Sequence, residues 1–259
     1  MTQNFRFLIK KSLTRFNPGV KSDSLNFVNK TLDADLASMN VDAVRGDGLV
    51  RVAHTEIRKL ILSGDLLPGD RVTVRPLVER LGLSATPIRT ALAALERQGL
   101  LESRDHRGFF VPLLSLDDLM EIYELREALE VIASRRAAQS PSRLELANEM
   151  EQLLEQQRAV VAAGDVSGYL ELDIRFHQLM WLASGNKRLV GVADNLFGQM
   201  RIGNNISARV PGRPEASLLE HEEIVEALRA GDPRAAEKAV RFHIRTAGKA
   251  LSQFMVRNS

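Results

Sequence analysis

Three helices are predicted in the first half of the chain, because apolar residues recur there every three or four positions. They span residues 52–63, 74–81 and 85–98. Thr73 and Ser84 precede the second and third helix as N-caps, and Gly82 and Gly99 end them. The short break between these two helices has the length of the turn in a helix-turn-helix motif.

A β-hairpin is predicted directly after the third helix. Residues 100–103 and 109–111 form two short strand-like runs around a polar segment that contains Arg104 and Arg107. A hairpin with a basic tip, placed behind a helix-turn-helix, is typical of the wing in a winged helix-turn-helix. We therefore assign residues 46–112 to a winged helix-turn-helix domain that binds DNA.

Six further helices are predicted beyond Pro112, where the strand pattern disappears. Their N-terminal signals are Ser115 with Asp118, Ser140-Pro141, Gly164-Asp165, Gly185-Asn186, Ser217 with Glu220, and Asp232-Pro233. The longest interruption is the stretch 211–214. The sequence thus predicts a mainly α protein, with an all-α six-helix bundle over residues 113–259.

The first 45 residues show neither a helical nor a strand period and are rich in Asn, Ser, Lys and Asp. This composition favours a flexible N-terminal extension. A tail that adds contacts to DNA is the alternative.

The amino-acid composition excludes several classes of protein and of metal site. The 259 residues are 44% hydrophobic, which is enough to bury a core in each of two domains. The absence of cysteine excludes disulfides and thiolate metal sites, so any metal must be held by nitrogen and oxygen. The apolar runs are far shorter than the roughly 18 residues of a membrane span or a secretory signal. We expect a cytoplasmic protein without a membrane partner.

The net charge of +2 is unevenly distributed along the chain. Residues 51–112 contain 10 Lys/Arg and 7 Asp/Glu, whereas residues 113–259 contain 18 and 21. A basic segment joined to an acidic one fits a nucleic-acid-binding module attached to a second domain.

Polar and basic side chains gather at the start of the third predicted helix. A recognition helix presents such residues to base edges in the major groove of double-stranded DNA. Ser84, Thr86 and Arg89 meet this requirement, and Arg75 and Arg107 are placed to reach phosphates or bases nearby. For any single arginine, an ordinary surface position is the alternative.

Three of the five histidines fall on inward faces of the predicted bundle. Asp173 and His177 share the apolar face of one helix at i,i+4, and His221 and His243 align with apolar residues of two others. Four polar groups in one core are costly unless they hydrogen-bond one another or bind a cation. Three imidazoles and a carboxylate suit a divalent ion, with Zn²⁺ favoured and Ni²⁺, Mn²⁺ or Fe²⁺ as alternatives.

The first domain resembles the GntR family of bacterial regulators over residues 51–112. The segments that carry the resemblance are residues 67–71, 81–89, 92–100 and 107–109. It implies that Arg75, Thr86, Arg89 and the wing around Gly108 contact the operator. The chain departs from the family at Ala85, where an arginine is frequent, and at Pro76, where glutamate is usual. The loss of the arginine at Ala85 leaves the base preference of this chain open.

The second domain resembles the FCD ligand-binding domain of the FadR subfamily over about residues 116–250, and its six helices resemble the VanR-type branch. The segments that match are residues 125–130, 173–177, 220–224 and 241–243. The resemblance implies a homodimer that leaves an inverted-repeat operator when a small organic acid, often a sugar acid or hydroxy-acid, binds beside the metal. It also implies that Arg126 meets the acid's carboxylate, and Asn195 is a second candidate for contact with this effector.

Three alternatives remain open at this point. Arg126 fits a surface ion pair with Glu130 equally well. A metal held by three histidines and a carboxylate also supports hydrolytic or oxygen chemistry in metalloenzymes, although neither a Gly-rich phosphate loop nor a nucleophile elbow accompanies these residues. Lastly, the metal of a regulator is sometimes purely structural, or is itself the signal.

Overall fold

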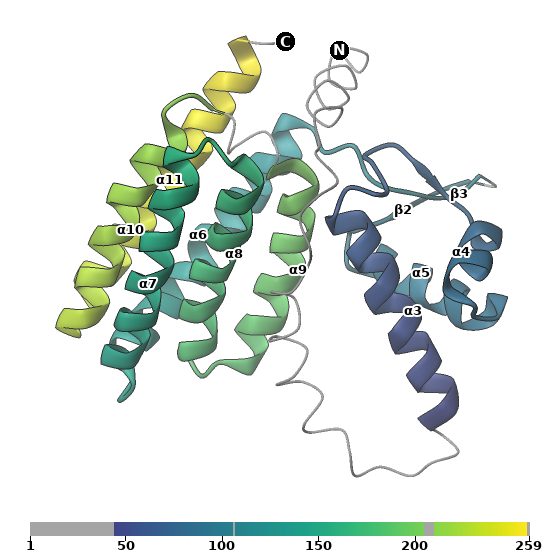
Figure 1. Ribbon diagram of the computed structural model, residues 1–259, viewed down its shortest axis with the longest axis horizontal. Coiled ribbons are helices and arrows are strands. Elements are labelled where there is room, and N and C mark those ends of the chain that lie inside the picture. The colour runs from purple at the N-terminus through teal and green to yellow at the C-terminus, as the bar shows by residue number, and fades with distance from the viewer. Residues whose placement is uncertain (1–43, 106, 205–209, 258–259) are drawn as a thin grey trace. The chain divides into compact units, whose positions relative to one another are not determined.

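The computed structural model describes residues 44–105, 107–204 and 210–257 (Figure 1). The chain divides into two compact units between Pro112 and Leu113. The fold is mainly α, as predicted, with one small sheet in the first unit.

The first unit contains the predicted helix-turn-helix. Its helices are α3 (Val44–Leu62), α4 (Val74–Leu81) and α5 (Ala85–Arg97). Thr73 and Ser84 are the N-caps of α4 and α5, and Gly82 ends α4 with a φ of 66°, a left-handed conformation that favours glycine. Both α3 and α4 pack against α5, whose Ile88 and Leu92 are fully buried.

The wing is an antiparallel sheet in the order β1-β3-β2. Its strands are β1 (Arg71–Val72), β2 (Glu102–Arg104) and β3 (Gly108–Phe110). The predicted hairpin is present, with Ser103 opposite Phe109. The sequence did not predict β1, because two residues are too few to show an alternating pattern.

The start of α3 corrects one prediction. The helix begins at Val44 instead of Val52, so the boundary placed between residues 45 and 46 falls inside it. The first two turns contain two glycines and Asp47, and such residues hide a helical period. Residues 1–43 of the expected extension lie outside the described part of the chain.

The second unit contains six helices within its described residues, as predicted. They are α6 (Leu116–Ala138), α7 (Arg143–Ala162), α8 (Val166–Ala183), α9 (Lys187–Asn204), α10 (Arg213–Ala230) and α11 (Pro233–Arg257). Figure 1 shows them side by side, with α11 against α6 and α10, and α8 against α6, α7 and α9. Phe176, Met180 and Trp181 of α8 lie in the core. Within the described ranges, no helix is long and apolar enough to cross a bilayer.

Two predicted helix starts are displaced. The helix assigned to Ser140-Pro141 begins at Arg143, because a turn in which Ser140 accepts a hydrogen bond from the N–H of Ser142 precedes it. The helix assigned to Ser217 begins at Arg213, behind Gly212. A proline is tolerated in the first turn, where its missing N–H has no helical partner, so Arg213 and Pro214, which the sequence assigned to an interruption, belong to α10.

Candidate DNA interface and metal centre

The predicted base-contacting residues lie exposed at the start of α5. Ser84, Thr86 and Arg89 are all exposed, and the Ser84 hydroxyl forms no capping hydrogen bond. Helix α5 presents these polar groups on one side and buries Ile88, Leu92 and Leu95 on the other. This arrangement is the one that a recognition helix requires.

Arg75, Arg107 and Gly108 are also exposed. Arg75 of α4 pairs with Glu79 at 3.1 Å, with 91% of its side chain exposed. Because an exposed pair of this kind contributes only about 0–1 kcal/mol, Arg75 is able to exchange Glu79 for a DNA phosphate. Gly108 has a φ of 89°, a conformation that L side chains rarely adopt, which explains a glycine at the wing.

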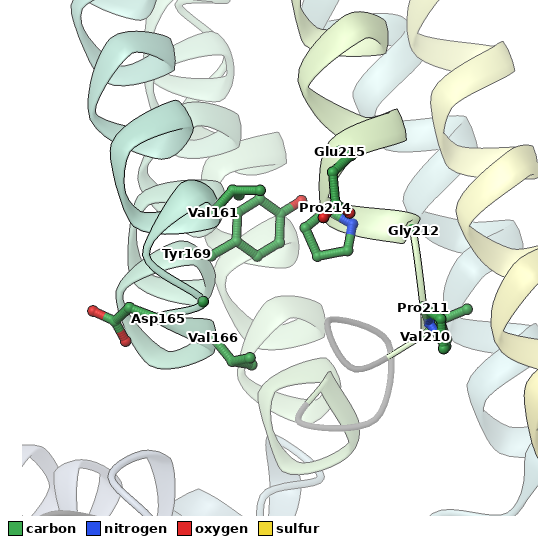
Figure 2. Close-up of a pocket in the computed structure, with 10 residues that line it drawn as sticks. Val161, Asp165, Val166, Tyr169, Val210, Pro211, Gly212, Pro214 and Glu215 are labelled. Carbon is green, nitrogen blue, oxygen red and sulfur yellow. The ribbon is translucent and has the colours of Figure 1, made fainter.

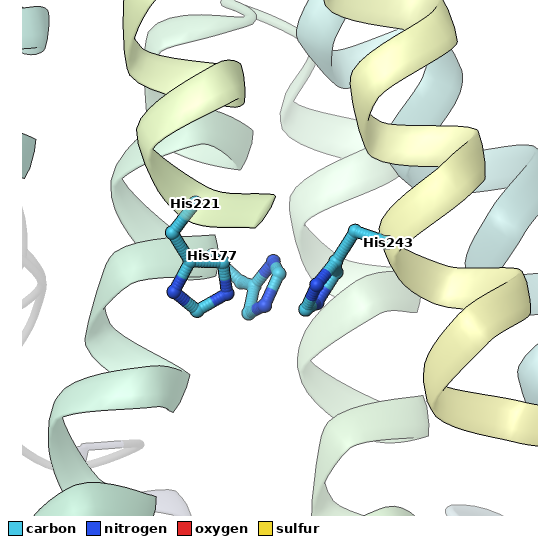
Figure 3. A group of neighbouring side chains, drawn as sticks. All are labelled: His177, His221 and His243. Carbon is cyan, nitrogen blue, oxygen red and sulfur yellow. The ribbon is translucent and has the colours of Figure 1, made fainter. Parts of the chain in front are cut away.

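Three buried histidines from three helices converge in the second unit (Figure 3). His177 of α8, His221 of α10 and His243 of α11 each offer a ring nitrogen, and these nitrogens lie within 4.8 Å of one another. Oδ1 of Asp173 lies 3.6 Å from Nε2 of His221 and 3.9 Å from Nε2 of His177. The structure therefore brings together all four predicted metal ligands.

Each of these imidazoles forms a hydrogen bond through Nδ1 to a residue that is not one of the four proposed ligands. The partners are Glu130 for His177 at 2.7 Å, Glu220 for His243 at 2.7 Å and Gln157 for His221 at 3.1 Å. A carboxylate only accepts hydrogen bonds, so Nδ1 of His177 and of His243 carries the proton and Nε2 carries the lone pair. Metal-binding histidines are oriented in this way in proteins.

One of the imidazole nitrogens in this cluster lacks a hydrogen-bond partner in the described part of the chain. Nε2 of His221 has no hydrogen bond within the described residues, and leaving such a group unsatisfied costs about 1–3 kcal/mol. A cation shared with Asp173 and the other two histidines would satisfy it. The donor set and this unpaired nitrogen both fit a divalent metal ion.

Burial keeps the three histidines neutral. It lowers the pKa of His177, His221 and His243 well below the usual range, so each neutral ring keeps one nitrogen lone pair. Burial also raises the pKa of Asp173 to about 6, while the positive charge of Arg126 opposes the rise.

We expect the free energy of unfolding of chelator-treated protein to decrease as the pH falls below about 6.5. The unfolded histidines take up protons there, whereas the folded ones, with lowered pKa values, do not. The raised pKa of Asp173 acts in the opposite direction below about 6, but it is one group against three. Urea unfolding at a series of pH values measures this. A free energy that stays constant or rises on acidification to about pH 5.5 would contradict the expected trend.

Arg126 is a buried part of this centre. Only 4% of its side chain is exposed, and it pairs with Glu130, so the ion pair exists but the surface position considered for it is wrong. Its Nη2 donates to Nε2 of His177 at 2.8 Å, and its guanidinium lies 4.7 Å from the centre of the Phe197 ring. Asn195 is half-buried on α9, and no hydrogen bond between described residues joins it to the histidines or to Arg126.

Among the residues around the ligands, the sequence did not single out Arg213, and it gave Glu130 and Glu220 no role at the metal. Arg213 and Glu220 form a second buried pair, with Nη1 donating to Oε1 at 2.8 Å. Arg213 was missed because its segment was interpreted as an interruption. Glu130 was available from the sequence, since it lies four residues after Arg126 and faces the same direction.

A pocket of about 310 Å³ lies between the start of α8 and the start of α10 (Figure 2). Tyr169 and Val166 of α8 line it together with Gly212 and Pro214 at the start of α10. The Tyr169 hydroxyl donates to Oδ1 of Asp173 at 3.3 Å, so one wall of the pocket contacts a predicted metal ligand.

Comparison with known proteins assigns both units. The family of bacterial regulatory proteins called gntR matches residues 49–111, and the FCD domain matches residues 121–246. The chain belongs to the GntR family. It is accordingly a DNA-binding regulator of transcription and not an enzyme, and the metalloenzyme interpretation is wrong.

Other GntR-family regulators are similar over most of their length. The chain is 36% identical to the "Probable D-xylose utilization operon transcriptional repressor" of Paenarthrobacter nicotinovorans, with 71% of this chain and 80% of that protein aligned. It is 27% identical to the HTH-type transcriptional repressor RspR of Escherichia coli, with 78% and 89% aligned. The solved structure of E. coli McbR/YncC has a TM-score of 0.68 at 23% identity, covering 79% of this chain and 97% of its own, which shows the shared fold.

Proposed function

We propose that this GntR-family regulator is a cytoplasmic repressor that leaves its operator when a small organic acid binds at a metal ion. The four ligands are Asp173, His177, His221 and His243. The observation that carries the proposal is the buried histidine cluster, in which outer partners hold Nδ1 and Nε2 of His221 has no partner among the described residues.

Zinc fits this ligand set best among the ions considered, with nickel, manganese or iron as alternatives. A bound divalent ion would offer open positions to the carboxylate and hydroxyl of a sugar acid or hydroxy-acid. Arg126, buried with its Nη2 2.8 Å from Nε2 of His177, supplies a permanent positive charge for the carboxylate. The pocket at Tyr169 supports an approach of the acid from that side.

The DNA-binding side of the proposal rests on the exposed face of the first unit. Ser84, Thr86 and Arg89 would read bases in the major groove, while Arg75 and the wing at Arg107 and Gly108 would contact the backbone. A homodimer presents two such units to an inverted repeat, which is why we propose that operator type.

The connection along the chain gives a route for coupling. Strand β3 ends at Phe110 and α6 begins at Leu116, so residues 111–115 alone separate the wing from the helix that carries Arg126. Because this connection is short, a shift of α6 on acid binding would also move the wing. If the acid favours a dimer geometry that no longer fits both half-sites, acid and DNA oppose each other reciprocally.

A structural or sensed metal is the second candidate. It is favoured by the burial of the histidines, of which none is more than 2% exposed. The acid-binding proposal differs from it in requiring a response to acid as well as to metal.

We expect at least one acid from a panel of sugar acids and small hydroxy-acids to weaken operator binding by metal-loaded protein about 5- to 150-fold. Operator fragments are first recovered from sheared genomic DNA by retention on the protein. Titration of each acid into the protein–operator complex, before and after chelation, measures the response.

The outcomes of this titration distinguish acid control from a sensed metal and from a structural metal. A response that chelation removes supports the proposal. Loss of DNA affinity on chelation alone indicates a sensed metal. Operator binding that neither metal nor any acid changes leaves a structural metal and contradicts acid control.

A further inference from the structure

The metal-facing nitrogen of His177 already has a partner in the protein. Its Nδ1 donates to Oε2 of Glu130 at 2.7 Å, so the ring has a single lone pair, on Nε2. Nη2 of Arg126 donates to that same Nε2 at 2.8 Å. The hydrogen bond uses the lone pair that a metal ion would need.

Arg126 is held firmly in this position. Its Nε donates to Oε1 of Glu130, one turn further along α6, and its guanidinium lies over Phe197. Glu130 therefore binds Arg126 with one carboxylate oxygen and His177 with the other. Arginine keeps its charge at every physiological pH, so the guanidinium is a permanent cation at the edge of the histidine cluster.

A metal ion and this guanidinium compete in two ways. They need the same lone pair of His177, and both are positive charges in a buried site where repulsion is weakly screened. Occupation of His177 by a metal therefore requires Arg126 to leave Nε2.

We propose that Arg126 is an internal cation that occupies the metal position on His177 and so limits metal affinity. This inference rests on the proposed metal site and adds how the site is regulated. An acid whose carboxylate draws the guanidinium away from His177 frees the lone pair, so acid and metal strengthen each other's binding.

Arg213 provides a matched comparison within the same centre. It is buried and paired with Glu220, as Arg126 is with Glu130. However, it approaches His243 at Nδ1, 3.3 Å away, and that nitrogen already donates to Glu220. Arg213 thus lies on the outer side of its histidine and leaves the metal-facing nitrogen clear.

We expect Arg126→Met to tighten Zn²⁺ binding at least about 10-fold, since it removes a hydrogen bond and a like charge while keeping an apolar stem over Phe197. Arg213→Met should leave zinc affinity unchanged or weaken it, because Glu220 loses the cation that orients it for His243. Zinc affinity is measured on the full chain by competition with a chromophoric chelator, with zinc as the sole added ligand. Thermal unfolding with and without zinc gives a second readout.

Arg126→Met leaves the Glu130 carboxylate buried without its cation, which threatens folding. The double variant Arg126→Met, Glu130→Gln removes that charge and retains an oxygen for His177, and it too should bind zinc more tightly than wild type. Tighter binding in these variants, or binding in them but not in wild type, supports the inference. Zinc affinity equal to or weaker than that of wild type overturns it while leaving the metal site intact. Absence of zinc binding in all variants overturns the metal site itself, and the inference with it.

Discussion

His221→Ala is expected to lower zinc affinity by more than about 100-fold. Loss of an outer hydrogen-bond partner alone typically costs 10- to 100-fold in metal affinity, and His221 is a proposed direct ligand. Its Nε2 is also buried without a hydrogen-bond partner among the described residues, so zinc binding would relieve an existing penalty. At a free zinc concentration about 1,000 times Kd, wild type should gain about 4 kcal/mol in unfolding free energy, and the variant almost none.

His54→Ala is the matched control for this experiment. His54 lies on α3 in the other unit and bonds to Gln98 at 2.9 Å, so its removal should leave the zinc content near one ion per chain. Elemental analysis of protein purified without chelators, together with thermal unfolding, measures both variants. Equal zinc content in wild type and His221→Ala would remove His221 from the ligand set.

The second large effect is expected at the proposed DNA-binding surface of the protein. There, Arg89→Ala should weaken binding to the specific operator about 5- to 150-fold. This range corresponds to 1–3 kcal/mol for a bidentate arginine–base contact. Binding to random DNA should change far less, because the lost contact is to a base and not to a phosphate.

Arg97→Ala serves as the control on the same helix. Arg97 is exposed in the last turn of α5, away from the end that is proposed to meet base edges. Fluorescence anisotropy on operator and random duplexes at fixed salt compares the variants. Should Arg97→Ala lose as much operator affinity as Arg89→Ala, or should both variants lose operator and random binding equally, Arg89 does not read a base.

The predicted elements came from local signals that act within a few residues. Gly82 and Gly99 end helices because of their own backbone freedom, and Asp165 caps α8 by accepting a hydrogen bond from the N–H of Gly168. The inward direction of His177 follows from the 3.6-residue period of α8 alone. Signals fail where the local pattern is too short or has two interpretations, as at β1 and at the start of α10.

The sequence by itself therefore determined the helix-turn-helix, the wing, the helical second unit and the set of inward histidines. Only the tertiary structure decided that the faces of α8, α10 and α11 meet at one point, since the rotation and crossing of packed helices depend on contacts far apart in the chain. It alone placed Arg126 on His177, a hydrogen bond between residues 51 positions apart. It also buried Arg213, whose charge favours the surface in any local pattern and is tolerated inside because Glu220 is there to pair with it.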